Sequence, residues 1–173
     1  MTIRRLAAAD CTKLSAFLTT NFTNDTASGG ALPAPTAAFL QAQLAVAPTW
    51  IDIVSGKIRG VLGPAMYGVR EVQHSPQIIR TFVYFNRLMV DYAIYAASRK
   101  TALTIAHGLT LAAANEIQAG TLPDDIIVDG SLTSRGASWC RLLNFTEEAH
   151  GPEGRWVCPA ADIWARLDAV VIA

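Results

Sequence analysis

The fold is decided by residues 82–116, FVYFNRLMVDYAIYAASRKTALTIAHGLTLAAANE, where a strand pattern runs directly into a helix pattern. From Thr81 to Val90, β-branched and aromatic residues alternate with polar ones in the period of a strand. The residues that follow are rich in Ala and Leu, and no proline occurs between Pro76 and Pro123. The pattern predicts one strand followed by one long, mostly apolar helix. A strand that leads into a helix N-terminus is a frequent phosphate-binding site.

The composition predicts one folded domain spanning residues 1–173, because 51% of the chain is hydrophobic and only 16% is charged. Fourteen Lys and Arg balance 14 Asp and Glu, and no basic run occurs. We therefore expect no nucleic-acid binding through a basic face. The mean hydropathy is +0.29, and this apolar excess predicts a surface for a protein partner, such as a homo-oligomer or a larger assembly.

The chain is not expected to enter a membrane. Its longest nearly uncharged stretch, residues 101–115, is shorter than the ~20 apolar residues that a membrane helix needs. The first residues do not resemble a signal peptide, and three widely spaced cysteines, Cys11, Cys140 and Cys158, do not suggest a disulfide framework. The expected location is therefore the cytoplasm.

The remaining segments alternate between strand and helix patterns. Asp10 is expected to cap the first helix, Gly63-Pro64 to break a strand, and Gly120 to end the long helix. Residues 162–167 are ambiguous between strand and helix. The predicted strands are 2–6, 50–54, 58–62, 65–69, 81–90, 125–129, 146–150 and 155–158, and the further helices are 10–21, 36–46 and 134–143. This order predicts an α/β fold with a mixed, largely antiparallel central sheet and helices on both faces.

The element order resembles that of the GCN5-related N-acetyltransferase (GNAT) family over nearly the whole chain. Ile3-Arg4-Arg5-Leu6 with Ala9-Asp10 is similar to the first strand and helix start of that family. Residues 134–148, SRGASWCRLLNFTEE, are similar to its short helix, following turn and last hairpin. The resemblance implies acetyl-CoA as cofactor and transfer of an acetyl group to an amine.

In the family, a valine-ended strand meets a glycine-containing loop whose backbone N–H groups hold the coenzyme A pyrophosphate, because glycine allows close approach of phosphate. In this chain Ala96 and Ser98 take the place of the glycines, and Tyr95 takes the place of a basic residue. Ser98 could cap the helix, and Arg99 or Lys100 could contact an anion. The cofactor-binding residues implied by the resemblance are Val90, Tyr95, Ala96, Ser98, Arg99 and Lys100.

The resemblance also implies positions for catalytic residues. Many GNAT enzymes use a tyrosine on the short helix as the general acid that protonates the departing thiolate. This tyrosine stands five residues before the phenylalanine of the turn, and in this chain the position is occupied by Cys140. A buried core cysteine is the alternative interpretation of Cys140. Glu71, Asp52 and His74 are candidates for a general base, and Glu71 is the one that we select.

The sequence predicts no metal site, because Cys140, His150 and Cys158 are spaced too irregularly for zinc. His107 is expected to be a hydrogen-bonded core residue, and the four tryptophans are expected to fill the core or a partner surface.

Two hypotheses about function remain open. In the first, the chain is an acetyl-CoA-dependent N-acetyltransferase with a degraded cofactor loop. In the second, it is an inactive GNAT-fold structural or interaction protein. Acetyltransferase-like proteins of this kind occur among internal or accessory virion proteins of short-tailed phages, and the segment after Ser134 is similar to theirs; the location would then be the virion.

Overall fold

A computed structural model of the chain describes residues 2–24, 34–72, 78–85, 87–129, 134–148 and 155–172. The strands are β1 (Ile3–Arg5), β2 (Trp50–Val54), β3 (Lys57–Leu62), β4 (Ala65–Val72), β5 (Ile78–Phe85), β6 (Leu88–Val90), β7 (Asp125–Asp129), β8 (Thr146–Glu147) and β9 (Arg155–Pro159). The α-helices are α1 (Cys11–Asn24), α2 (Ala37–Leu44), α3 (Tyr92–Ala97), α4 (Arg99–Ala119), α5 (Ser134–Leu142) and α6 (Ile163–Asp168). The predicted α/β class is confirmed.

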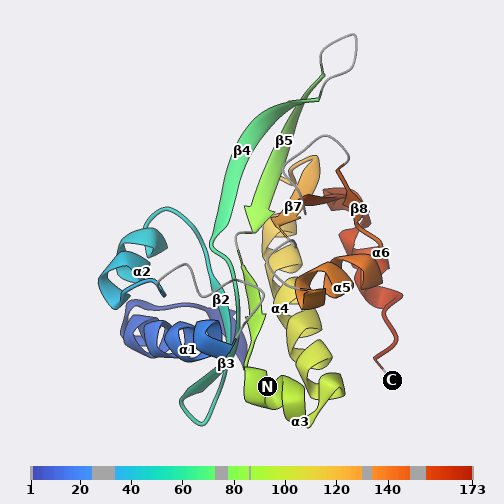
Figure 1. The fold of residues 1–173 in the computed structure, drawn as a ribbon. Coiled ribbons are helices and arrows are strands. Elements are labelled where there is room, and N and C mark those ends of the chain that lie inside the picture. Colours follow the sequence, from blue (N-terminus) through green and yellow to red (C-terminus); the bar gives the residue numbers. More distant parts are fainter. Residues whose placement is uncertain are drawn as a thin grey trace.

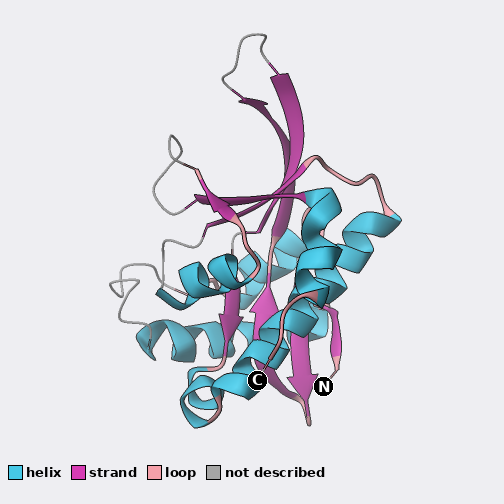
Figure 2. Ribbon diagram, turned by 90° about the vertical axis from the view of Figure 1, so that its right-hand side faces the viewer, coloured by secondary structure: helices cyan, strands magenta, loops and turns pink. Residues whose placement is uncertain are grey.

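The strands form two sheets with helices on both sides (Figures 1 and 2). The first has the antiparallel order β1-β2-β3-β6, and the second has the order β4-β5-β7-β9-β8, in which β5 and β7 are parallel. Helices α1 and α2 cover one face of the first sheet with a core around Leu18 and Ile51. Helix α4 covers the other face, and its residues Ile105 and Leu109 belong to the larger core shared with α5 and α6.

The predicted strand 81–90 is not continuous. It divides into β5, which belongs to the second sheet, and β6, which belongs to the first. The neighbouring segment changes sheets at the same level, because β3 belongs to the first sheet and β4 to the second. At this point the Gly63 N–H donates to the Arg87 carbonyl at 2.8 Å. Gly63 has a φ of 126°, a backbone conformation that favours glycine. The break at Gly63-Pro64 was predicted, but its effect on the partner strand was not.

The predicted long helix is also divided. Helix α3 ends at Ala97, and Ser98 then caps α4 by accepting a hydrogen bond from the Thr101 N–H at 3.2 Å. Gly120 follows the last residue of α4, as predicted. Residues 162–167, ambiguous in the sequence, lie mainly in α6.

The predicted helix cap at Asp10 is wrong. A 3-10 turn, Ala8–Asp10, precedes α1, and the Asp10 carboxylate accepts from the Ala7 N–H at 3.2 Å and from the Arg4 guanidinium at 2.7 and 2.9 Å. Asp10 therefore fixes the chain before the helix rather than capping it. The predicted loop 24–35 and the turn at residues 151–154 fall mainly outside the described residues.

Candidate functional site

A groove of about 360 Å³ lies between the N-terminal end of α4 and helix α5. Its walls combine cations with apolar side chains from α3, α4, α5 and the C-terminal segment. The lining residues are Tyr95, Arg99, Lys100, Leu103, Ser138, Trp139, Leu142 and Val171. The structure thus brings together three of the six predicted cofactor-binding residues, Tyr95, Arg99 and Lys100. The Arg99 and Lys100 side chains are exposed, so both charges are available to an anion in the groove.

The backbone at this groove differs from the predicted phosphate-binding loop. Residues 92–97 form helix α3, and the Ser98 N–H donates to the Ile94 carbonyl at 2.8 Å. At the start of α3, Asp91 Oδ1 accepts from the Ala93 and Ile94 N–H groups. Ala96 therefore lies within a helix, and the Ser98 N–H is already bonded. The backbone here is a helix, which Asp91 and the alanines stabilise, and not the loop that the family resemblance implies. The predicted cofactor contacts of Ala96 and Ser98 remain predictions.

The start of α4 retains unbonded donors. The first N–H groups of an α-helix have no acceptor within the helix. Ser98 Oγ satisfies the Thr101 N–H, so the N–H groups of Arg99 and Lys100 are left for an external acceptor. Positive backbone dipoles and two cationic side chains thus meet at one end of the groove.

Val90 lies at the end of β6, which is the outer strand of the first sheet among the described residues. Two hydrogen bonds show which backbone groups near β6 point toward β3. The Asp91 N–H donates to the carbonyl of Arg59 in β3, and the Arg87 carbonyl accepts from the N–H of Gly63, which directly follows β3. Because backbone groups alternate in direction along a strand, the N–H and C=O groups of Leu88 and Val90 point away from β3. The edge of β6 can therefore pair with an extended ligand.

A small apolar cavity of about 30 Å³ lies between β6 and β7, with Leu88 and Val128 among its lining residues. Cys140 also lines it and is 2% exposed. Trp139 lines both this cavity and the groove. Cys140 is thus a buried core residue as the alternative interpretation held, and its predicted role as an acid remains untested.

The two general-base candidates that the structure describes, Glu71 and Asp52, are not together. Glu71 is exposed on the outer half of β4, in the hairpin that projects from the body (Figure 1). Asp52 is fully buried and pairs with Arg59, with Oδ2 2.6 Å from Arg59 Nη2. His74 lies outside the described residues. The structure does not place Glu71 at the groove, because the hairpin and the N-terminal end of α4 lie at opposite ends of the molecule.

The predictions about His107 and the tryptophans are mostly confirmed. His107 is half-buried, with Nε2 3.1 Å from the Leu167 carbonyl oxygen. Three of the four tryptophans are buried, Trp50, Trp139 and Trp156. No cluster of three or more metal-ligating side chains occurs within the described ranges, and His150 lies outside them. Among the helices of the described segments, each is too short or too polar to span a bilayer.

Two roles were not predicted from the sequence: Asp91 as the cap of α3 and Trp139 as a lining residue of the groove. Asp91 stands directly before a run of helix-forming residues, which is a typical position for a helix cap. Trp139 and Leu142 are three residues apart on α5 and so share a face. Nothing in their spacing indicated that this face would border a groove.

The fold is that of the GNAT acetyltransferases. A point mutant of the AtaT toxin, bound to the C-terminus of the antitoxin AtaR and to acetyl-CoA, has a TM-score of 0.63 and 13% identity, covering 95% of this chain and 96% of that chain. AtaT complexed with acetyl-methionyl-tRNAfMet has a TM-score of 0.63 and 13% identity, over 95% and 97%. A mutant of BH1408 from Bacillus halodurans has a TM-score of 0.65 and 17% identity, over 88% and 98%. No protein-family model and no curated protein matches the sequence.

Proposed function

We propose that the chain binds acetyl-CoA in the groove between α4 and α5 and transfers its acetyl group to an amine. The observation that carries the proposal is the groove itself, which is lined by Arg99 and Lys100 beside the unbonded N–H groups of the α4 N-terminus. Two cations and a helix N-terminus provide the charge that a pyrophosphate requires. The AtaT toxin, similar in fold, binds acetyl-CoA.

The chain's residues fit the other parts of the coenzyme as well. The outward N–H and C=O groups of Leu88 and Val90 can form hydrogen bonds with the amide groups of the pantetheine arm, which would then lie beside β6 like an added strand. Bound acetyl-CoA would supply an activated thioester. Transfer would form an amide, break the carbon–sulfur bond and release coenzyme A, and the proton that the amine loses would balance the proton that the coenzyme thiolate gains. Cys140, on α5, is the side chain that the family resemblance assigns to that protonation.

The acceptor that we propose is a small amine or a polypeptide amine rather than a tRNA. AtaT was captured with an acetylated methionyl-tRNA. Tight binding of a tRNA depends on many phosphate contacts from Lys and Arg. This chain has a formal net charge of zero, which does not favour such contacts.

Titration calorimetry with acetyl-CoA tests the proposal. We expect binding by the wild type, and a loss of about tenfold in affinity (about 1.4 kcal/mol) when Arg99 and Lys100 are both replaced by Ala. Lys57→Ala removes an exposed lysine from the start of β3 and serves as the matched control. Absence of heat at millimolar acetyl-CoA, or equal binding by the double variant, would contradict the proposal. Release of free coenzyme A with a panel of amines then measures transfer.

The second candidate function is an inactive structural or interaction protein, such as a phage virion component. One observation favours it: α3 occupies the position of the phosphate-binding loop, with the Asp91 carboxylate at its N-terminus. A carboxylate there repels the coenzyme phosphates. If acetyl-CoA does not bind, this second function becomes the better supported of the two.

A further inference from the structure

The apolar cavity of about 30 Å³ is lined by side chains from both sheets and from α4, α5 and α6. Leu88 lines it from β6, and Val128 lines it from β7. Trp139 on α5 lines both this cavity and the larger groove. The cavity and the groove are therefore neighbours that share one wall.

The cavity lies where the reactive end of a coenzyme in the groove would be. Lys100 at the groove and Thr110 at the cavity are both on α4, and their spacing in the sequence corresponds to about 15 Å along the helix. A pantetheine arm that starts at Lys100 and follows the edge of β6 from Val90 to Leu88 would end at this cavity. The acyl group at the end of that arm would then enter it.

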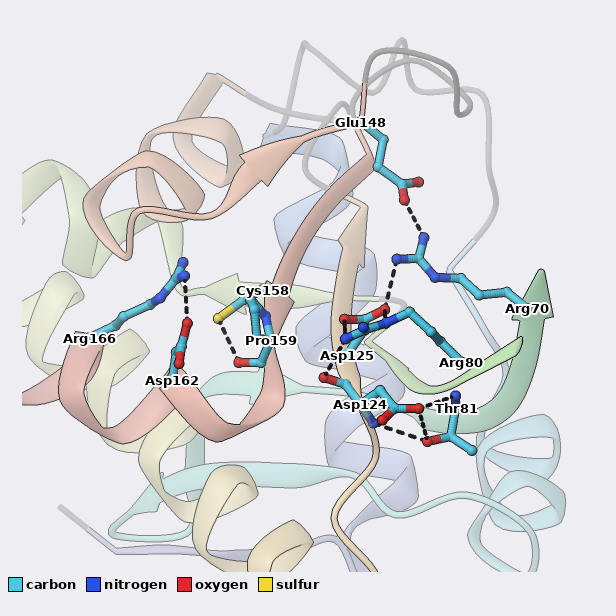
Figure 3. A network of polar contacts seen from close by, with 10 residues as sticks. All are labelled: Arg70, Arg80, Thr81, Asp124, Asp125, Glu148, Cys158, Pro159, Asp162 and Arg166. Atoms are coloured by element: carbon cyan, nitrogen blue, oxygen red, sulfur yellow. Dashed lines mark hydrogen bonds and ion pairs between the residues drawn. The ribbon is translucent and has the colours of Figure 1, made fainter. Parts of the chain in front are cut away.

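Helix α6, which follows the last strand, closes the cavity with Ile163. This side chain is 1% exposed and lines the cavity. Arg166 on α6 pairs with Asp162 directly before the helix at 3.1 Å (Figure 3). Trp164 Nε1 donates to Asn115 Oδ1 on α4 at 3.1 Å. These contacts fix α6 against α4, so Ile163 forms a firm wall of the cavity.

The volume of the cavity corresponds to one carbon atom. An apolar cavity of about 150 Å³ holds benzene, which gives about 25 Å³ for each carbon. The cavity of about 30 Å³ therefore fits the methyl group of an acetyl group, and the ethyl group of propionyl needs roughly twice that volume.

The walls of the cavity also disfavour a charged acyl group. Among the side chains that line it, the Thr110 hydroxyl already donates to the Ala106 carbonyl at 2.8 Å. A carboxylate, such as that of a succinyl group, would lose its hydration there with no cation in the lining to replace it.

We propose that Ile163 restricts the acyl group carried by the coenzyme to acetyl, because it closes the cavity that receives the methyl group. This inference rests on the proposed function, since it takes the thioester to lie beside Leu88. Longer acyl groups are excluded by size, and charged acyl groups by the cost of desolvation. The selecting side chain comes from α6, beyond the strands that hold the arm.

Titration calorimetry with a series of coenzyme thioesters tests this selection in the wild type. Acetyl-CoA should bind about fourfold more tightly than free coenzyme A, because one methyl group is buried. Propionyl-CoA should bind about tenfold more weakly than acetyl-CoA, because a closed pocket discriminates strongly against one extra methylene. Equal binding of the two thioesters would overturn this inference and leave the proposed function intact. Absence of binding by every thioester would contradict the proposed function and this inference with it.

Ile163→Val enlarges the cavity by about one carbon atom and should remove the preference for acetyl-CoA over propionyl-CoA. Ile105→Val is the matched control, because Ile105 is also 1% exposed in the same core but is not among the residues that line the cavity. The two substitutions should cost similar stability, which circular dichroism monitors. Retention of the preference by Ile163→Val, or its equal loss in the control, would overturn the proposal.

Val128→Ile tests the same cavity in the opposite direction. It adds one carbon atom to a half-buried wall residue, which is about the volume that the cavity offers. Acetyl-CoA should then bind no more tightly than free coenzyme A, while free coenzyme A binds as it does to the wild type. A preserved preference for acetyl-CoA in this variant would show that the acyl group lies elsewhere and would overturn the proposal.

Discussion

Replacement of Gly60 by Ala tests how closely α4 is packed on the first sheet. Gly60 lies on β3, and a Cβ atom there would come 2.8 Å from Ile105 Cγ2 and 3.0 Å from Leu109 Cδ1. It would also come 3.2 Å from the Met89 carbonyl oxygen on β6. Ile105 and Leu109 are 1% and 0% exposed, so neither can rotate into solvent. The added methyl group must displace α4, β6 or both.

The expected magnitude combines two opposing effects. Inserting a methyl group into a packed core costs about 1–3 kcal/mol. Removal of glycine from the unfolded chain returns about 0.4–1 kcal/mol. The net destabilisation of Gly60→Ala should therefore be about 1–2 kcal/mol, and each kcal/mol lowers the melting temperature of a chain of this length by about 2–4 °C.

Urea unfolding of Gly60→Ala beside Gly120→Ala gives the measurement. At Gly120 the nearest atom to an added Cβ is the Ile117 carbonyl oxygen at 3.7 Å, an ordinary contact, and the φ of −100° suits alanine. This control should change stability by less than about 0.5 kcal/mol. If Gly60→Ala is as stable as the wild type, α4 does not pack on β3 in the way described.

Three further predictions concern the ends of the helices and a buried thiol. The Arg4 guanidinium holds the pKa of Asp10 below its usual value of 3.8. This ion pair therefore stabilises the fold above that pH, and the stabilisation is lost as the pH falls through the lowered pKa. In urea unfolding, Asp10→Asn should lose about 0.5–1 kcal/mol of stability at pH 7 and less at pH 3. Burial raises the pKa of Cys158 to about 11, so a thiol reagent at pH 8 should modify it only after denaturation, and rapid reaction of the native protein would refute its burial. Ser98→Ala removes the cap of α4 and should cost about 1 kcal/mol; thermal unfolding with no change would show that the cap is not formed.

Most elements could be predicted because their patterns are local. Trp50–Val54 and Asp125–Asp129 were predicted with the observed bounds, since short β-branched runs between turn residues have one good interpretation. Ser98 before a basic helix start was recognisable as a cap. The fold class followed from the order of these elements, and the resemblance to a known family from two terminal motifs.

The breaks in the central segment could not be predicted, because they depend on contacts between distant residues. Residues 81–90 have a strand pattern throughout. The division between β5 and β6 lies opposite Gly63, which donates to the Arg87 carbonyl where both neighbouring strands change sheets. The separation of Glu71 from the groove follows from the same division. No spacing within either strand indicates such a pairwise effect.

The break leaves β6 as the outer strand of the first sheet among the described residues, with the outward backbone groups of Leu88 and Val90 on its unpaired edge. Beyond the break, β4 and β5 belong to the second sheet and form the hairpin that lies at the opposite end of the molecule from the N-terminal end of α4. Substitutions on this hairpin should therefore leave coenzyme binding unchanged. Val69→Lys, on β4, should bind acetyl-CoA with the affinity of the wild type in titration calorimetry, and a loss of binding would mean that the break itself had been disturbed.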